Sequence, residues 1–466
     1  MERTLINQTP EMIGPTIKLQ GWAETVRDMG KLTFIDLRDR TGKIQIVGYQ
    51  MLKDITTESV IEIIGEVKKR PEKMINQESK TGTIEVDVKE YKILNKSLPL
   101  PIPVEGDGYE INEEARLKYR YLDLRRDRMH KILKLRSDFI RAIRESLYNQ
   151  DFIEVETPLL TTATKEGARD FLVPSRMNPG KFYALPQSPQ QYKQLLMSAG
   201  VENYFQVARC VRDENLRADR GFEFTQIDLE TSFRTQEEVR SIMERMVKES
   251  VKAVNGKIRE GDFAVYTFKE AEEQFGGDKF DIRTEDEKEQ GVLAFAWVIK
   301  YPMFKKVDKE DIAEVRDGKS GWTFTHNPFS GIIEDHRDWH LNGINIDQIE
   351  ATQYDLICNG FEMGSGSIRN HEPEMLKATY KIMGYSDQET EDNIGHMLRA
   401  FEVGTPPHGG MALGIDRLVM LLAGEKSLKE IIPFPMTYTG KTSVMDAPAE
   451  AKEDQLKDLG LEIRKK

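Results

Sequence analysis

The sequence has no apolar run of membrane-spanning length, and among its 466 residues it has only two cysteines, Cys210 and Cys358. A transmembrane helix needs roughly 20 consecutive apolar residues, so no membrane span is predicted. Residues 1–14 also lack the basic-then-apolar order of a secretory signal peptide. Two cysteines cannot form a disulfide framework in a chain of this length. These absences predict a protein of the reducing cytoplasm with two buried thiols.

Two common nucleotide-binding motifs are also missing. The sequence contains neither the phosphate-loop pattern GxxxxGK[ST] nor a GxGxxG motif after an N-terminal strand. A bound nucleotide would therefore lie on an antiparallel sheet and be held by side chains and metal ions. The net charge of -12 argues against a nucleic-acid partner for the chain as a whole. However, residues 1–103 are nearly neutral and residues 113–150 are basic, which is compatible with RNA binding.

The length predicts roughly two to four domains. Residues 17–94 form five β-like runs separated by turn residues, which predicts a small barrel of the oligonucleotide-binding (OB) type. The segment 95–106 holds three prolines, which is typical of an extended linker. We therefore predict a barrel domain over residues 1–104, a second domain over residues 105–466, and an α+β fold class.

Three residues of the predicted barrel could recognise single-stranded nucleic acid. Phe34 and Gln45 belong to adjacent strands, and Arg27 precedes the second strand. Together they offer a stacking surface, an amide for base edges and a cation for phosphate or base. An aromatic residue in a strand is more often part of a core, so this grouping alone is weak.

In the first part of the second domain, the sequence predicts a helix followed by a strand. Residues 112–152 carry apolar side chains at helical spacing, which predicts one long amphipathic helix with a basic outer face. Residues 152–160 are β-like, and Pro158 within them favours an edge or interface position. Thr235 and Glu238 then predict a capping box at the start of another helix.

The C-terminal part predicts several strands. Residues 292–304 are typical of a buried strand, although residues 256–322 as a whole are difficult to interpret. Residues 353–370 predict a strand, a glycine-bearing turn and a second strand. Residues 406–432 predict a glycine-rich strand that runs into an apolar helix. No internal repeat or low-complexity segment is present.

A predicted hairpin over residues 204–230 carries an unusual mixture of charges. Its cations are Arg209, Arg212, Arg217 and Arg220, and its anions are Asp213, Glu214, Glu223 and Asp228. Phe222 and Phe224 lie among them on the second strand. This mixture suits an anionic, partly planar ligand. An exposed hairpin with surface salt bridges would show the same pattern.

Other residues would complement this hairpin if they came to the same sheet. Asp355 and Glu362 are acids on neighbouring predicted strands and could hold Mg2+ against a polyphosphate. Arg212 and Arg417 could bind phosphate oxygens in bidentate fashion, and Phe224 offers a plane for a base. A nucleoside triphosphate is the ligand that these residues suggest. Taken singly, each acid could be a solvated strand end and each arginine a surface ion pair.

Several blocks resemble class II aminoacyl-tRNA synthetases. "VRDE" at 211–214 with "FEFTQID" at 222–228 resembles motif 2, the strand with Pro158 resembles motif 1, and "GGMALGIDRLVMLL" resembles motif 3 with Arg417 as its arginine. The blocks "YRYLDLRR", "ATKEGARDF", "ALPQSPQQYKQLLM" and "PPHGGMALGIDRLVMLLAGEKS" are similar to bacterial-type aspartyl-tRNA synthetases. The resemblance extends over most of the chain. It implies a class II catalytic domain with an antiparallel sheet flanked by helices.

The resemblance also implies residue roles in binding aspartate. Arg369 and Lys193 would bind the side-chain carboxylate, and Gln190 and Arg212 the α-carboxylate. His326 would close over the amino acid. The ammonium group would be surrounded by Asp228, Ser188 and Glu166.

Further implied roles concern ATP, metal and tRNA. ATP would be bound by Arg212, Glu214, Phe224, Glu362, Gly414, Ile415, Asp416 and Arg417. Mg2+ would be held at Asp355 and Glu362, and the catalytic residues would be Arg212, Glu362 and Arg417. The anticodon would be bound by Arg27, Phe34 and Gln45.

The implied function is ligation of aspartate to tRNA-Asp with ATP, by a homodimer that forms through motif 1. The sequence leaves open whether tRNA-Asn is also charged. A synthetase-derived RNA-binding or regulatory protein without full catalysis is the alternative, although Arg212, Glu362, Arg369 and Arg417 are all present. A free-standing asparagine-forming ligase of the same fold would lack the N-terminal barrel.

Three positions or segments depart from the family pattern. The chain between Asp228 and His326 is too short for the additional domain that bacterial-type members usually carry there, so we predict that this insertion is absent or reduced to about residues 256–322. Asn327 stands where the family commonly has a second histidine. Gly221 is small where bacterial relatives often have a polar residue. Arg217 and Arg220 could meet either the triphosphate or the tRNA acceptor end.

Overall fold

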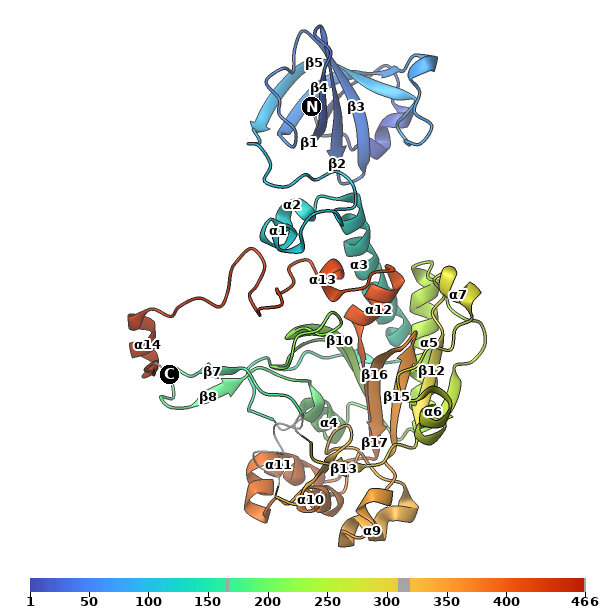
Figure 1. The fold of residues 1–466 in the computed structure, drawn as a ribbon, viewed down its shortest axis with the longest axis vertical. Coiled ribbons are helices and arrows are strands. Elements are labelled where there is room, and N and C mark those ends of the chain that lie inside the picture. The colour runs from blue at the N-terminus through green and yellow to red at the C-terminus, as the bar shows by residue number, and fades with distance from the viewer. Residues whose placement is uncertain (165–166, 309–318, 465–466) are drawn as a thin grey trace. The chain divides into compact units, whose positions relative to one another are not determined.

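A computed structural model describes residues 1–164, 167–308 and 319–464. The chain divides into two compact units, Met1–Pro103 and Val104–Lys466 (Figure 1). Each unit has its own hydrophobic core. Within the described residues, no helix is both long and apolar enough to cross a membrane.

The first unit is a closed barrel with the strand order β1-β2-β3-β5-β4. Its elements are η1 (Ile6–Glu11), β1 (Thr16–Asp28), β2 (Leu32–Asp39), β3 (Gly42–Tyr49), β4 (Val60–Lys69), η2 (Glu72–Met74) and β5 (Ile84–Asn95). Alternate residues of each strand are buried, for example Ile35 and Leu37 on β2 and Ile44 and Ile46 on β3. This period of two explains why the five β-like runs of the sequence correspond to the five strands.

The second unit is built on an eight-stranded sheet with the order β11-β12-β15-β16-β17-β10-β9-β6. Neighbouring strands are antiparallel except for the pairs at the two ends of the sheet, β11 with β12 and β6 with β9. Figure 1 shows β15, β16 and β17 in the centre of this unit. The strands are β6 (Ile153–Glu154), β9 (Asn203–Val211), β10 (Glu223–Ser232), β11 (Ala264–Thr267), β12 (Phe295–Ile299), β15 (Gln353–Cys358), β16 (Phe361–Ile368) and β17 (His408–Gly414).

Two hairpins of this sheet carry most of the predicted site. β9 and β10 pair antiparallel along their length, as the sequence predicts. β15 and β16 are joined by Asn359 and Gly360, both with positive φ (52° and 87°). A two-residue turn with this backbone matches the right-handed twist of its strands, which is why an Asn-Gly pair favours it.

Three helices pack over one core with this sheet. They are α3 (Asp127–Tyr148), α5 (Gln236–Ala253) and α12 (Ile415–Leu422), and their apolar residues share one cluster with those of β10, β15 and β17. Helix α5 begins with the predicted capping box, in which the Thr235 side chain accepts a hydrogen bond from the Glu238 backbone N-H. Cys210 and Cys358 are buried thiols outside any disulfide, as predicted.

The remaining elements surround the sheet. A second core cluster joins β13, β14, α10 and α11, and α4 contacts both β10 and α11. The full set of elements outside the sheet, apart from α3, α5 and α12, is α1 (Glu113–Lys118), α2 (Arg120–Asp123), β7 (Leu172–Pro174), β8 (Phe182–Ala184), α4 (Gln190–Ser198), α6 (Phe268–Phe275), α7 (Glu285–Glu289), β13 (Phe304–Lys306), β14 (Trp322–Phe324), η3 (Glu334–His336), α9 (Arg337–Asn342), η4 (Ile346–Gln348), α10 (Pro373–Ile382), α11 (Asp387–Phe401), α13 (Leu428–Ile431) and α14 (Glu453–Leu459) in the described part of the second unit.

Three predicted elements differ in the structure. The helix predicted over 112–152 is divided into α1, α2 and α3, and Arg126 before α3 has an extended backbone. The strand predicted over 152–160 is only two residues long, and it ends four residues before Pro158. The strand predicted over 292–304 ends at Ile299, because Lys300 has a φ of 61° and Pro302 follows.

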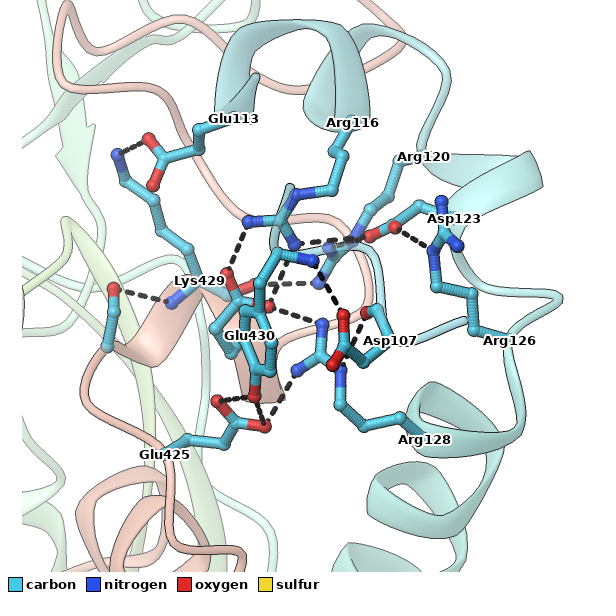
Figure 2. Close-up of polar contacts among 12 residues, drawn as sticks. Asp107, Glu113, Arg116, Arg120, Asp123, Arg126, Arg128, Glu425, Lys429 and Glu430 are labelled. Carbon is cyan, nitrogen blue, oxygen red and sulfur yellow. Dashed lines mark hydrogen bonds and ion pairs between the residues drawn. The ribbon is translucent and has the colours of Figure 1, made fainter. Parts of the chain in front are cut away.

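A network of ion pairs fixes the start of the second unit to α13. We call it the bracket: Arg116, Arg120, Asp123, Arg126, Arg128, Glu425, Lys429 and Glu430. Figure 2 shows Arg116 and Arg128 meeting on Glu430. Arg120 donates to the backbone carbonyls of Lys429, Ile432 and Pro433. These buried contacts interrupt the predicted long helix, since they draw its polar face into the interior.

Candidate active site

A cavity of about 280 Å3 opens on β10, β16 and β17. It gathers side chains from the β9-β10 hairpin, from α4 and α12, and from the loop at His326. Of the residues predicted to bind aspartate or ATP, those lining it are Ser188, Gln190, Lys193, Arg212, Glu214, Phe224, Asp228, His326, Glu362, Arg369, Gly414, Asp416 and Arg417.

Glu166, predicted to lie beside the ammonium group, is outside the described residues. Two other residues predicted for this site, Ile415 and Asp355, do not line the cavity. Ile415 belongs to the hydrophobic core, so its side chain supports α12. Asp355 is buried on β15, one strand away from the lining residue Ser365.

One end of the cavity holds four buried charges. Lys193 Nζ lies 3.0 Å from Asp228 Oδ2 and 3.1 Å from Glu230 Oε2. Arg369 Nε lies 2.9 Å from Glu230 Oε1, and its two other nitrogens donate to Ser367 Oγ and to Glu230 Oε2 and the Gly410 carbonyl. Each of the four side chains is almost fully buried. The cluster contains two cations and two anions.

Glu230 was not predicted as a site residue. It lies two residues after Asp228 on β10, and residues two apart in a strand point to the same face. This spacing is the signal in the sequence that could have identified it. Glu230 pairs with Gly410 on β17, where a Cβ atom would lie 2.2 Å from Glu230 Oε2. Glycine at position 410 therefore makes room for the carboxylate that holds both cations.

The two acids of this cluster differ in their pKa values. Burial raises the pKa of Asp228 to about 6, although Lys193 opposes the shift. Burial also acts to raise the pKa of Glu230, but Arg369 and Lys193 outweigh it and lower that pKa to about 2. Within the described part of the chain, Asp228 Oδ1 has no hydrogen-bond partner. Because an unpaired buried acceptor is costly, this oxygen is suited to a donor on a ligand.

A chain of buried amides leads to the same end of the cavity. Gln190 Nε2 donates to Gln194 Oε1 at 3.0 Å, and Gln194 Nε2 lies 3.0 Å from His408 Nε2. His408 Nδ1 lies 2.8 Å from the Pro406 carbonyl. Burial lowers the pKa of His408 to about 4, so a neutral ring donates from Nδ1 and accepts at Nε2. This chain fixes the orientation of Gln190.

The opposite end of the cavity presents arginines beside an aromatic ring. The Arg212 guanidinium lies 5.0 Å from the centre of the Phe224 ring, and its Nε donates to the Gln187 carbonyl. Arg220 pairs with Glu214 at 2.8 Å. Arg417 pairs with Asp219 at 3.3 Å and donates to the Glu362 carbonyl at 2.7 Å. The predicted cations and the predicted aromatic plane therefore share one cavity.

Asp416 is held by two groups of the scaffold. One carboxylate oxygen pairs with Arg136 of α3, and the other accepts a 2.8 Å hydrogen bond from the Thr225 backbone N-H. Asp416 thus joins α3, α12 and β10 at the lining of the cavity.

The two predicted metal ligands lie on adjacent strands. Asp355 accepts hydrogen bonds from Ser365 and from Gln353, and burial together with the nearby Glu362 raises its pKa to about 7. Glu362 pairs with Lys279, which the sequence did not identify. Among the residues that the structure describes, no group of three or more His, Cys, Asp or Glu side chains could hold a metal ion.

His326 and Asn327 have different roles. Burial lowers the pKa of His326 to about 3, with Arg369 adding to the shift, so that the ring is neutral. Asn327 is buried, and its Oδ1 accepts hydrogen bonds from the Phe329 backbone N-H and from Ser330 Oγ. Asn327 therefore closes the turn that carries His326.

The predicted anticodon residues lie together on the outer face of the barrel. Arg27 pairs directly with Phe34 across β1 and β2, and Gln45 pairs with Asp36, two residues along from Phe34. All three side chains thus share one face. Arg27 lies 3.2 Å from Asp36, and Gln45 donates to Glu85 at 2.8 Å.

Comparisons with known proteins agree with this geometry. The model of the family "tRNA synthetases class II (D, K and N)" matches residues 112–438. A protein of Oceanobacillus iheyensis named aspartate–tRNA ligase is 35% identical, over 97% of this chain and 97% of that protein. The chain belongs to the aspartate–tRNA ligase family. A Bacillus cereus relative named aspartate–tRNA(Asp/Asn) ligase is 36% identical over 98% of this chain and 97% of its own.

The first unit also matches a family model, and the fold matches solved structures. The OB-fold nucleic acid binding domain matches residues 17–94, which confirms the predicted fold class. The fold also matches the aspartyl-tRNA synthetase of Entamoeba histolytica (TM-score 0.70, 21% identity, 93% of this chain and 91% of that one). An asparaginyl-tRNA synthetase of Pyrococcus horikoshii solved with asparaginyl-adenylate gives a TM-score of 0.72 at 21% identity, over 94% of this chain and 98% of that one.

This family member is shorter than its bacterial relatives. Its alignment with the Oceanobacillus protein runs over 576 positions, whereas the chain has 466 residues. The relative therefore contains additional sequence of the size of a small domain.

Proposed function

We propose that this protein is an aspartate–tRNA ligase, which activates L-aspartate with ATP and transfers it to the 3' end of tRNA-Asp. The observation that carries this proposal is the buried cluster of Lys193, Arg369, Asp228 and Glu230 at one end of a cavity whose other end is lined by arginines. Such a cavity can bind a small dicarboxylic amino acid beside a polyphosphate.

The charged cluster explains how aspartate would be bound. Its side-chain carboxylate would accept hydrogen bonds from Lys193 and Arg369, while Asp228 Oδ1 would accept from its ammonium group. We place Ser188 and Glu166 beside the ammonium group and His326 over the amino acid. Glu230 holds both cations in place before the substrate arrives.

The same cluster would reject asparagine. A neutral amide facing Lys193 and Arg369 would leave buried charge without its partner. Breaking one side of a buried ion pair costs roughly 3–5 kcal/mol, which corresponds to a large preference for aspartate.

Activation would depend on placing the α-carboxylate beside the α-phosphorus of ATP. Gln190 and Arg212 would hold that carboxylate, which is already ionised and needs no general base. Arg212 and Arg417 would bind phosphate oxygens, and Phe224 would stack on the base. Glu214 and Gly414 would border the nucleotide, and Asp416 would act through the scaffold.

Asp355 and Glu362 fit a magnesium ion. They are two adjacent carboxylates, each of which raises the electrostatic cost of ionising the other, and Mg2+ is usually bound by one or two carboxylates together with substrate phosphates. When bound, Mg2+ would neutralise charge on the polyphosphate while the adenylyl group passes to the α-carboxylate and pyrophosphate leaves.

We further propose that the barrel binds the anticodon through Arg27, Phe34 and Gln45 in a cytoplasmic homodimer formed through the motif 1 region. The names of the Bacillus cereus and Natranaerobius thermophilus relatives support tRNA-Asn as a second substrate. The alignment with the Oceanobacillus protein is longer than this chain, which supports the absence of an insertion between Asp228 and His326. We propose that its tRNA contacts are absent as well.

The test of the proposed function is exchange of labelled pyrophosphate into ATP. Exchange should require aspartate and should not occur with asparagine. Absence of exchange in a protein that still binds tRNA would instead support a regulatory RNA-binding role. Charging purified tRNA-Asp and tRNA-Asn side by side would then decide between one and two tRNA substrates.

A further inference from the structure

A loop with no predicted role places a lysine beside the proposed metal ligands. Residues 276–280 connect α6 to the segment before α7, and Lys279 of this loop lines the cavity. Its Nζ lies 3.1 Å from Glu362 Oε2, so the two side chains form an ion pair. A charged lysine is therefore present where the polyphosphate of ATP would lie.

The loop is anchored immediately after Lys279. The Phe280 ring stacks on Phe275, with 4.1 Å between ring centres, and contacts the edge of Tyr266. The Phe280 carbonyl accepts a 3.0 Å hydrogen bond from the backbone of Gly360, in the turn between β15 and β16. Glu362 lies on β16 two residues after that turn. The backbone of Lys279 is thus fixed to the hairpin that carries both acids.

The residue before Lys279 reaches the other acid. Asp278 Oδ2 accepts a hydrogen bond from the Tyr301 hydroxyl at 3.5 Å, and Tyr301 also interacts with Asp355. The loop therefore contacts Glu362 directly and Asp355 through Tyr301. An ordinary surface lysine would not be anchored on both sides in this way.

The Lys279 side chain is free to change partners. Its exposed fraction is 53%, compared with 30% for Glu362. Lysine carries a compact charge with three donors on a flexible stem, which suits a phosphate oxygen that arrives from solution. A magnesium ion held by Glu362 would offset the negative charge with which Lys279 pairs, and would so weaken this ion pair.

We propose that Lys279 is a polyphosphate-binding residue. It holds Glu362 in the free enzyme and exchanges this carboxylate for an oxygen of the β- or γ-phosphate when ATP binds with Mg2+. This inference rests on the proposed function for the identity of the nucleotide. The proposal adds a nucleotide contact from residues 256–322, which were difficult to interpret from the sequence.

The test measures nucleotide binding directly and does not depend on turnover. The variant Lys279→Met keeps most of the side-chain volume and removes the charge. Isothermal titration with ATP and Mg2+, without aspartate, should show roughly tenfold weaker binding, the loss of one charged hydrogen bond. Binding of AMP should not change, because AMP lacks the β- and γ-phosphates. Lys279→Arg should restore part of the ATP affinity.

A matched control is Lys269→Met, which removes an exposed lysine from the neighbouring helix α6. It should bind ATP as the wild-type protein does. Equal ATP affinity in Lys279→Met and wild type would overturn the proposal, as would an equal loss of ATP and AMP binding, since that would show a purely structural role. If the wild-type protein binds ATP in a Lys279-dependent way but shows no aspartate-dependent exchange, the proposed function fails and this inference stands.

Discussion

The second unit contains two clusters of buried charge whose carboxylates differ in one respect. The bracket joins α1, α2 and α3 to α13. The other cluster, which we call the substrate cluster, lies on α4, β10 and the chain after β16 and consists of Lys193, Asp228, Glu230 and Arg369. In the bracket, Glu430 is paired with both Arg116 and Arg128, which outweigh the effect of burial and lower its pKa to about 2. In the substrate cluster, burial raises the pKa of Asp228 to about 6, and one of its oxygens has no partner within the described residues.

This difference indicates that the bracket contributes to stability and that the substrate cluster contributes to ligand binding. A buried charge whose partners all come from the protein contributes to one folded arrangement, and removing a partner is costly. A buried carboxylate with a vacant hydrogen-bonding position leaves part of that interaction for a ligand. We therefore expect changes to the bracket to affect unfolding, and changes to the substrate cluster to affect aspartate.

The largest effect is expected for Arg369→Ala. This change leaves Glu230 buried with one cation instead of two and removes a donor to the substrate carboxylate, so kcat/KM for aspartate should fall by roughly 3–5 kcal/mol in activation free energy. ATP binding, measured by titration, should persist. An unchanged KM for aspartate would refute the assigned contact.

A matched control for this variant is Arg116→Ala. The two arginines are similarly buried, but Arg116 lies in the bracket and pairs with Glu430. Its loss should lower the thermal midpoint and leave the ratio of aspartate to ATP affinity unchanged.

The next largest effect is expected for Glu430→Gln. The amide keeps the shape but loses the charge that Arg116 and Arg128 share, so the free energy of unfolding should fall by about 2 kcal/mol. Denaturant titration would measure this change. The comparison of the two clusters would be wrong if Glu430→Gln altered KM for aspartate more than it altered stability.

The pH dependence should distinguish the clusters next. The pKa of Asp228 is raised in the folded protein, so the folded state keeps a proton that the unfolded chain releases between about pH 4 and pH 6. Its contribution to stability is therefore greatest below pH 4 and is lost as the pH rises through 6. Binding of the substrate aspartate needs the ionised form of Asp228, so kcat/KM for aspartate should fall roughly tenfold per pH unit below pH 6. Asp228→Asn should abolish this step in the profile.

The smallest effect is expected in the barrel. Arg27→Ala removes a half-exposed ion pair with Asp36, which contributes little to stability. The KM for tRNA should rise several-fold, corresponding to about 1 kcal/mol. Aspartate-dependent pyrophosphate exchange, which needs no tRNA, should be unchanged, and a loss of exchange would contradict an anticodon role.

The sequence predicts elements well where one face alone is buried. The five barrel strands alternate apolar and polar residues, so their period is visible. The helix over 112–152 was predicted wrongly because Arg120, Asp123 and Arg126 are buried in pairs. A pattern based on hydrophobicity assigns such residues to the solvent side.

The aspartate-binding part of the site was predictable only through the resemblance, whereas the nucleotide-binding part was also suggested by residue chemistry. Lys193 and Arg369 belong to the first group and Arg417 to the second, and all three lie in one cavity. Glu230 and Lys279 were missed, because Glu230 acts through its two cations and Lys279 comes from a loop without periodicity. Asn327 could not be interpreted until the structure showed that it closes a turn.

The pairing of β10 with β17 also has a consequence for the order of folding. Gln226 pairs with Gly414, a contact between residues far apart in the chain, whereas the Asn359-Gly360 turn joins neighbours. Closing a long loop costs more chain entropy than closing a short one, so distant strands tend to pair late. Asp228 and Glu230 belong to one partner of that late pair. We expect the capacity to bind aspartate to develop at the end of refolding, after most helical signal has returned, so that ligand binding reports completion of the native chain.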